Sequence, residues 1–168
     1  MKRIAAVFAL FALACLLCAG CMRPAAQKTV SMYDLSRAML DALKTEETMR
    51  YVSASDAGAE EKFARVSDTD YADVEDFFLL YAENGAGNAD EIAVIAVKHE
   101  RDASAAADSL RAHVEYRTQL YATYDPAQVP KLNGALVFTE GRYAVLIVCD
   151  EPTDVKTAFY AFLAEGTE

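Results

Sequence analysis

Tryptophan is absent from this 168-residue sequence, histidine occurs only twice, and basic residues are outnumbered by acidic ones, 16 to 26. The formal charge of −10 repels phosphate backbones, so we expect no nucleic-acid partner. Apolar residues make up 54% of the chain, a composition that excludes a disordered polymer and a collagen-like fibre. Length and composition together predict one domain with a packed core.

The familiar signatures of catalytic and metal sites are also missing. The motifs G-x-S-x-G, Ser-x-x-Lys and H-E-x-x-H do not occur in the sequence. His99 and His113 are fourteen positions apart and lack the i, i+4 spacing typical of zinc ligands. His113 borders the apolar stripe of an expected helix, where a hydrogen-bonded structural histidine is the common outcome; the alternative is a metal ligand or a general base. We expect no cofactor, no metal ion and no catalytic residue.

The first twenty residues have the pattern of a targeting segment. Lys2 and Arg3 precede fourteen uncharged residues, 4–17. That length is typical of the apolar region of a signal peptide and falls short of the roughly 20 residues that span a membrane. Residues 19–21 (Ala-Gly-Cys) follow and resemble the lipobox of bacterial lipoproteins. The resemblance implies cleavage before Cys21 and attachment of a diacylglycerol to its thiol.

Other ways of processing the N-terminus remain open. Cys18 stands where the lipobox usually has leucine, and Cys15 is a rival lipidation site because it also follows small and apolar residues. An ordinary secretory cleavage and an uncleaved anchor are further alternatives. We predict lipidation at Cys21, with residues 1–20 as the signal peptide and residues 21–31 as a lipid-anchored tether.

Cleavage before Cys21 would leave 148 residues with a net charge of −12. Cys149 would then be the only free thiol, so we expect no intramolecular disulfide. A body this acidic is repelled by anionic lipid and would not lie flat on it. We therefore expect the protein at the extracytoplasmic face of the cell membrane, held to the membrane through its lipid anchor.

Apolar periodicity in the rest of the chain predicts the elements of an α+β domain. The expected helices are 32–44, 59–65, 102–124 and 152–163, and the expected strands are 74–82, 91–98, 135–139 and 143–149. Asp34 is expected to cap the first helix, and residues 49–52 are ambiguous between a short strand and a loop. The apolar stripe of the long helix is expected to reach Tyr124. Residues 140–141 (Glu-Gly) predict a tight hairpin turn, and residues 129–130 (Val-Pro) an extended loop.

The order of these elements predicts a four-stranded antiparallel sheet with the order ββαββα, packed by helices and preceded by N-terminal helices. The expected domain covers residues 32–164. The strand at 91–98 is apolar on both faces, and the two late helices are expected to share one face of the sheet. Either the helix at 32–44 covers the second face, or that face meets a partner or a ligand. We expect the first arrangement, a closed monomer.

Several of these segments carry a family resemblance. The matching residues are Asp70, Val74-Glu75-Asp76, Glu91-Ile92-Ala93, Pro130, Gly141-Arg142-Tyr143 and 145–148. In this pattern the chain resembles domain of unknown function 4358, a family found in lipoproteins of Firmicutes, especially clostridia. The resemblance covers residues 32–163 and implies a lipobox signal peptide followed by one small extracytoplasmic domain. It implies no established activity.

Three other patterns suggest sites and have simpler interpretations. Five carboxylates crowd residues 68–76, but their spacing fails an EF-hand loop at positions 5, 6 and 12; a solvated turn is expected, with a loose divalent-cation site as the alternative. Residues 85–90 contain Gly-x-Gly but link two strands, whereas a dinucleotide-binding loop leads into a helix. Cys149 follows an apolar run and precedes Asp150, so a buried structural thiol is expected.

These observations predict a lipid-anchored extracytoplasmic lipoprotein that acts as a non-enzymatic binding or interaction module of the cell envelope. Its partner would be an unknown envelope protein or ligand. The alternative is an accessory envelope hydrolase or transferase that uses scattered carboxylates. A cleft with two or more carboxylates would favour this alternative, and an apolar or aromatic patch would favour the binding module. In a closed monomer the binding site is expected in loops such as 84–88 or 125–134.

Overall fold

The computed structural model describes residues 30–83 and 88–166 of the chain. Its α-helices are α2 (Met32–Leu43), α3 (Ala59–Phe63), α4 (Ala103–Tyr124), α5 (Val129–Asn133) and α6 (Pro152–Glu165). Its strands are β1 (Met49–Ser53), β2 (Val74–Ala82), β3 (Glu91–Val97), β4 (Leu136–Glu140) and β5 (Tyr143–Val148). Three short 3-10 helices complete the order: η1 (Tyr71–Asp73), η2 (Glu100–Asp102) and η3 (Pro126–Gln128).

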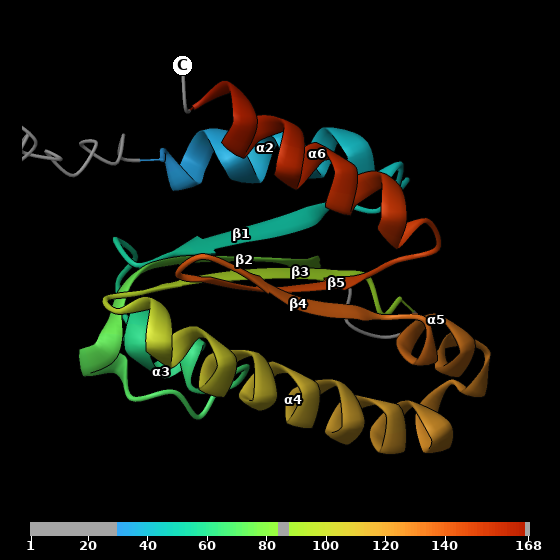
Figure 1. Ribbon diagram of the computed structural model, residues 1–168. Coiled ribbons are helices and arrows are strands. Elements are labelled where there is room, and N and C mark those ends of the chain that lie inside the picture. The colour runs from blue at the N-terminus through green and yellow to red at the C-terminus, as the bar shows by residue number, and fades with distance from the viewer. Residues whose placement is uncertain (1–29, 84–87, 167–168) are drawn as a thin grey trace, which may run out of the picture.

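The five strands form one antiparallel sheet in the order β1-β2-β3-β5-β4 (Figure 1). The α+β class and the antiparallel pairing are confirmed, but the expected count of four strands is wrong. The ambiguous segment is strand β1, which pairs along β2 with Met49 opposite Ala82 and Ser53 opposite Phe78. Strand β1 has five residues and one buried side chain, Val52. So short a segment has too little apolar periodicity to be predicted as a strand from its own sequence.

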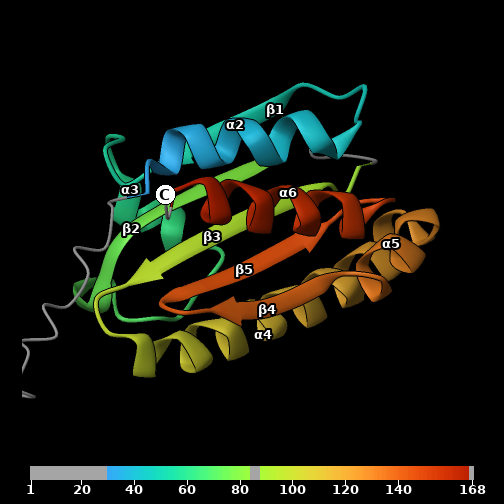
Figure 2. The ribbon, with the colours of Figure 1, turned by 45° about the horizontal axis from the view of Figure 1, so that its top comes forward.

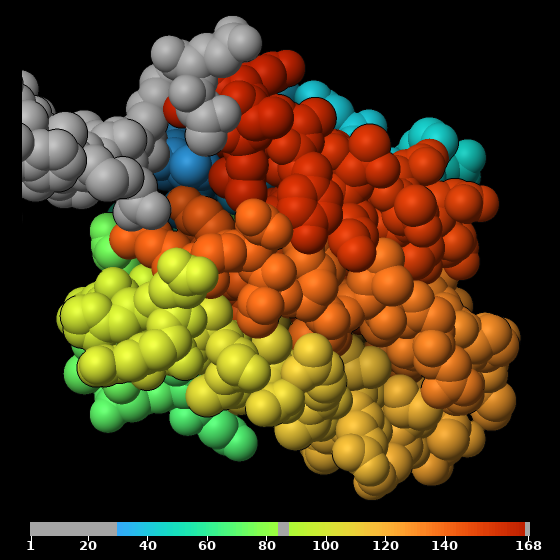
Figure 3. Space-filling model, in the orientation of Figure 1, coloured from blue at the N-terminus to red at the C-terminus, as the bar shows by residue number. Residues whose placement is uncertain are grey.

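Helices cover both faces of the sheet, which makes a three-layer sandwich (Figures 1 and 2). Helices α3, α4 and α5 lie on one face, and α2 and α6 lie side by side on the other. The expectation that the two late helices share a face is therefore wrong, because α4 and α6 lie on opposite sides. The space-filling view shows the outer strand β4 between α6 and α4, so these layers present a continuous surface (Figure 3).

Each face of the sheet has its own apolar core. The core under α3 and α4 includes Phe63, Phe77, Leu79, Ile95 and Leu110. The core under α2 and α6 includes Leu35, Met39, Phe78, Val94 and Phe159. Side chains along β2 alternate between the two cores, since residues 77 and 79 enter the first core and residues 78 and 80 the second. The helix predicted at 32–44 does cover the second face, together with α6.

Three local expectations need correction. Helix α2 is capped by Ser31, whose Oγ accepts a hydrogen bond of 3.2 Å from the backbone N–H of Asp34. The side chain of Tyr124 is 76% exposed and does not extend the buried stripe of α4. Val129 and Pro130 begin helix α5 instead of an extended loop, because a proline in the first turn of a helix needs no N–H and has a suitable φ.

The tight hairpin between β4 and β5 is confirmed, but its turn lies one residue later than the expected 140–141. Glu140 pairs with Tyr143, so the turn consists of Gly141 and Arg142. Gly141 has φ +50, a left-handed conformation that glycine adopts without a steric penalty. Within the described residues, no helix is both long and apolar enough to cross a membrane.

We predict that Met39→Asp lowers the free energy of unfolding by at least about 3 kcal/mol, because it removes a buried side chain and places a charge in the core. Met39 is fully buried between α2 and the sheet. Chemical denaturation followed by circular dichroism measures the change. Arg37→Asp is the matched control, since it puts the same side chain on the exposed face of α2 and should change stability by roughly 0.5 kcal/mol or less. Equal stability of the two variants would place α2 outside the core.

Candidate functional site

Two of the sequence-predicted features lie outside the described residues. These are the predicted lipidation site, Cys21, and the glycine-containing part of the β2–β3 connection, residues 84–87. The other candidates lie in the described parts of the chain, where their surroundings can be compared with the expectations.

The acidic residues at 68–76 are used separately. The Asp70 carboxylate accepts a hydrogen bond from the backbone N–H of Ala72, and that of Asp76 accepts one from Phe77. Glu75 forms an ion pair with Arg142. Across residues 30–83 and 88–166, no three His, Cys, Asp or Glu side chains gather where they would hold a metal ion. The segment thus runs through η1 into the start of β2, and the carboxylates of Asp70, Glu75 and Asp76 bond to local backbone or to the neighbouring hairpin.

The two histidines have different surroundings. His99 is exposed, just before η2. His113 lies on α4 with only 12% of its side chain exposed, and its Nε2 is 2.9 Å from Oε2 of Glu91 at the start of β3. The expectation of a hydrogen-bonded histidine at position 113 is confirmed, and its partner is a buried carboxylate.

Glu91 is the centre of a buried group of charges. Its side chain is 6% exposed, and Nη1 of Arg117, one turn along α4 from His113, donates to the same oxygen, Oε2, at 2.7 Å. Burial alone would raise the pKa of the Glu91 carboxyl, but the Arg117 charge and the hydrogen bond from His113 outweigh burial and hold that pKa below its ordinary value. Glu91 is therefore ionised at neutral pH.

The ionised carboxylate fixes the proton on His113. A carboxylate without a proton only accepts hydrogen bonds, so Nε2 of His113 is the donor in this contact. In the neutral ring, Nδ1 then carries the lone pair and is an acceptor. Glu91 thus sets both the orientation and the tautomer of the imidazole, as outer carboxylates do for functional histidines.

A second buried ion pair lies beside the first. The ammonium of Lys131 on α5 is 2.7 Å from Oδ1 of Asp90, whose side chain is 5% exposed. Asp90 also accepts hydrogen bonds from Thr45 and Asn88. Burial alone would lower the pKa of Lys131, but its contacts with Asp90 and Asp150 outweigh burial and raise it. Lys131 is therefore charged at neutral pH.

The backbone leading into β3 is held by the same layer of helices. Arg117 donates to the carbonyl of Ala89 at 3.1 Å, and Oε1 of Gln128 accepts from the N–H of Ala89 at 3.0 Å. The Tyr121 hydroxyl donates to the carbonyl of Asn88 at 2.9 Å. Gln128, like Lys131, therefore points toward residues 88–90. The segment 125–134, which was expected to be a binding loop, therefore supports residues 88–90 through these two side chains.

Asp90 and Glu91 are site residues that the sequence patterns described above do not predict. The available signal was a pair of adjacent carboxylates at the start of an otherwise apolar strand, where charges need partners. A second signal was the i, i+4, i+8 spacing of His113, Arg117 and Tyr121, which places three polar side chains on one face of a helix.

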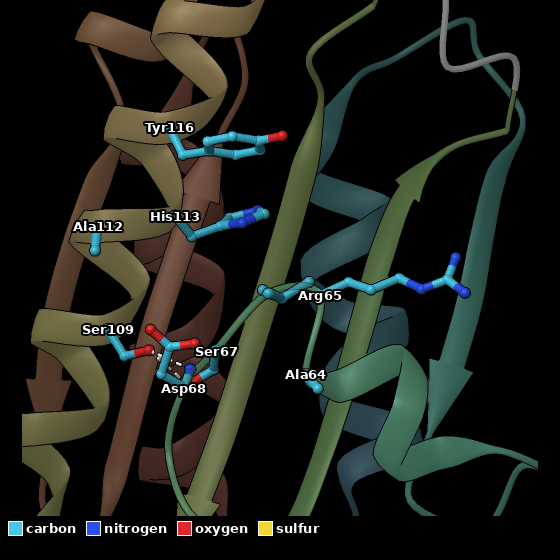
Figure 4. A pocket seen from close by; sticks show the side chains of 9 residues that line it. Ala64, Arg65, Ser67, Asp68, Ser109, Ala112, His113 and Tyr116 are labelled. Atoms are coloured by element: carbon cyan, nitrogen blue, oxygen red, sulfur yellow. Dashed lines mark hydrogen bonds between the residues drawn. The ribbon is translucent and has the colours of Figure 1, made fainter.

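A small surface pocket lies between the end of α3 and the middle of α4, with a volume of about 180 Å³ (Figure 4). His113 and Tyr116 line it from α4, with Ser109 one turn before His113. Ser67 and Asp68 line it from the opposite segment. The Ser109 Oγ accepts from the backbone N–H of Asp68 at 2.6 Å and from the Ser67 hydroxyl at 3.0 Å. These bonds fix the two walls relative to each other.

A wider, shallower hollow of about 590 Å³ lies between α4 and β4. Its lining is a mixture of apolar and polar side chains, with Val114, Leu132 and Val137 next to Arg111 and Glu115. Each of the two hollows has one carboxylate in its lining, Asp68 in the first and Glu115 in the second. Neither provides the pair of carboxylates that the alternative hydrolase or transferase would need.

Cys149 is buried directly after β5, with 3% of its surface exposed. Burial raises the pKa of its thiol to about 11, and the charges of Asp90 and Asp150 add to the increase. The thiol is therefore protonated at neutral pH and is a poor nucleophile. The expectation of a buried structural cysteine is confirmed.

The described residues form an α+β fold whose sheet is covered on both faces and whose α4 helix links a buried ion network to a surface pocket. A family model described as "Domain of unknown function (DUF4358)" matches residues 51–149. The chain belongs to this family. Comparison with curated proteins and with solved structures gave no match.

We predict that Glu91→Gln lowers the free energy of unfolding at pH 7 by roughly 1.5–3 kcal/mol, since it weakens hydrogen bonds to charged groups. The folded-state pKa of Glu91 lies below its ordinary value of 4.5, so the carboxylate stabilises the fold above about pH 4.5. This contribution is lost as the pH falls through the folded-state value. Urea denaturation at several pH values should show the difference from the native protein closing in acid.

The matched control for this series is Glu115→Gln, which removes an exposed carboxylate from α4. It should change stability by roughly 0.5 kcal/mol or less at every pH tested. A Glu91→Gln effect that is the same at pH 7 and pH 3 would contradict the ionised state assigned to Glu91.

We predict that iodoacetamide at pH 8 leaves Cys149 unmodified in the folded protein, because the thiol is buried and its pKa is about 11. After unfolding in guanidinium, the same reagent should alkylate it within minutes. Peptide mass spectrometry distinguishes Cys149 from the N-terminal cysteines. Rapid alkylation in the folded state would show that this end of β5 is open to solvent.

Proposed function

We propose that this protein is a lipid-anchored extracytoplasmic lipoprotein, and that its domain is a non-enzymatic binding or interaction module of the cell envelope. The observation that carries the proposal is the sequence Ala19-Gly20-Cys21 behind a basic start and an uncharged run of fourteen residues. Membership of the family adds support, given the resemblance to Firmicutes lipoproteins on which the expectation rests. Residues 1–20 would be removed, and the thiol of Cys21 would carry a diacylglycerol.

The distance between anchor and domain suits this arrangement. Helix α2 begins at Met32, so ten residues, 22–31, separate it from Cys21. Fully extended, they reach roughly 33–36 Å. Two acyl chains anchor a protein stably where one does not, and the acidic domain would be repelled from anionic lipid. The domain would then stand off the membrane with its surface open to soluble or envelope partners.

A closed monomer supports a binding role better than a catalytic one. Asp90 and Glu91, the buried carboxylates described above, are both engaged by cationic side chains. Cys149 is a protonated thiol. The α3–α4 pocket, in contrast, has polar side chains and one exposed aromatic ring, that of Tyr116. Convergent polar groups beside an aromatic surface are typical of a ligand-binding site.

The anchor is tested by Cys21→Ala in the full-length protein expressed in a bacterium that processes lipoproteins. We expect the native protein in the membrane fraction with a lipid adduct on Cys21, because cleavage and acylation require that thiol. The variant should lack the adduct. Mass spectrometry of the N-terminal peptide and membrane fractionation give the two readouts.

Cys18→Ala and Cys15→Ala are the matched controls, because each removes a neighbouring thiol and leaves Ala19-Gly20-Cys21 in place. Both should keep the lipid on Cys21. A Cys21→Ala protein that is cut at the same bond and released normally would show an ordinary secretory cleavage and overturn the proposed anchor.

A further inference from the structure

The α3–α4 pocket has a specific arrangement of charge. Tyr116 and His113 project from the same side of α4, and Asp68 lies on the opposite wall next to Ser109 (Figure 4). The guanidinium of Arg65 points away from α4 in this view and is paired with Glu61 at 2.7 Å. The one basic side chain in the lining is thus already engaged with an acid outside the pocket.

Arg65 and Asp68 are both charged side chains of the pocket lining, and Asp68 has no compensating charge among the described residues. Its backbone N–H is bonded to Ser109, but within residues 30–83 and 88–166 its carboxylate forms no ion pair. Behind the pocket wall, the negative charge of Glu91 is compensated by Arg117 at 2.7 Å. The pocket therefore has one uncompensated negative charge, that of Asp68. The formal charge of the whole chain is also negative, −10. Such a field attracts cations and repels anions.

The other two groups suit a cation that donates hydrogen bonds. Nε2 of His113 donates to the buried Glu91, so Nδ1 accepts hydrogen bonds whenever the ring is neutral. Tyr116 is 63% exposed and lines the pocket, and aromatic rings attract ammonium groups. A carboxylate, a ring-nitrogen acceptor and an aromatic ring together match an ammonium group, which has three donors and no acceptor.

The size of the pocket limits what it would hold. Its volume of about 180 Å³ is below the roughly 300–1,000 Å³ typical of sites for whole drug-sized ligands. It is suited to one head group with a short stem. A metal ion is less well matched, because Asp68 and His113 are only two ligating side chains, fewer than the three or four of protein zinc sites.

We infer that the pocket between α3 and α4 binds a primary ammonium group, with Asp68 as the counter-charge, Nδ1 of His113 as a hydrogen-bond acceptor and the Tyr116 ring as an aromatic surface. The inference rests on the proposed function, since it names the ligand chemistry of a binding module. The ammonium belongs either to a small free amine or to a lysine side chain of a protein partner.

The test uses the ¹⁵N-labelled full-length protein in detergent micelles, titrated with methylammonium chloride. We expect saturable changes in amide chemical shift at Ser67, Asp68, Ser109 and His113, with no such changes in sodium chloride of equal ionic strength. Asp68→Asn should weaken binding roughly tenfold or more, because it removes the charge that the ammonium pairs with. Tyr116→Ala should weaken it roughly two- to fivefold.

Matched controls lie on the same helix outside the pocket. Asp108→Asn removes an exposed carboxylate from α4, and Tyr124→Ala removes an exposed ring. Both should bind methylammonium as the native protein does. Equal weakening by Asp68→Asn and Asp108→Asn would show general attraction by the acidic surface and overturn the inference. So would the absence of saturable shifts, or shifts caused by zinc chloride and not by methylammonium.

Two further probes separate the sources of the ammonium group. Putrescine represents a free amine, and an acetylated, amidated Gly-Lys-Gly tripeptide represents a lysine side chain. Tighter binding of either one supports the inference and assigns the source. A protein that carries lipid on Cys21 but does not respond to any of these amines would overturn the inference while leaving the proposed anchor intact, because fractionation does not depend on the pocket.

Discussion

The central strand β3 is apolar on both of its faces, and this one property requires the three-layer structure. Every residue from Glu91 to Val97 is buried. A strand of this kind is stable in water only when helices cover the sheet from both sides. Helix α2 comes from the start of the chain and α6 from its end, and both are needed on the second face. The domain is therefore closed, and ligands have access only to its outer surfaces and edges.

The polar start of β3 sets the register of this apolar strand. Glu91 meets two side chains of α4, and Asp90 meets Lys131 of α5. A shift of the strand by one residue would exchange its two faces and move these carboxylates away from their cationic partners. Losing such a partner leaves a buried unpaired charge, which is strongly destabilising. The same contact holds His113 in the wall of the α3–α4 pocket, so the fold and the candidate binding site depend on one carboxylate.

Local patterns were sufficient to predict much of the fold. Alternation along 74–82 and the helical spacing within 32–44 each report on a single element, and both elements formed as expected. The sequence of strand β1 is ambiguous because an edge strand this short is defined by its pairing with β2, which no local pattern contains. The face expected for α6 is wrong for a related reason. Helix α6 packs beside α2, which lies more than a hundred residues earlier in the chain, and no local pattern reports that contact.

The site was predicted less completely than the fold. His113 was identified as a hydrogen-bonded residue, but Glu91 is 22 positions away in the chain and Lys131 is 41 positions from Asp90. Such pairs form only when a strand and the helices that follow it pack together. The segment 125–134 was expected to be a binding loop, yet Gln128 and Lys131 support residues 88–90. Periodicity identifies buried faces, whereas the partner of a buried charge is determined by the tertiary structure.

The central claim is that α2 closes the second face of the sheet as part of one cooperative core. Native-state hydrogen exchange of the full-length protein in micelles tests this claim most directly. We expect amides in the middle of α2, around Met39, to exchange with the same free energy of opening as those of β3, because α2 leaves the sheet only on global unfolding. Rapid exchange throughout α2 while β3 stays protected would contradict it, and would mean that the second face is open.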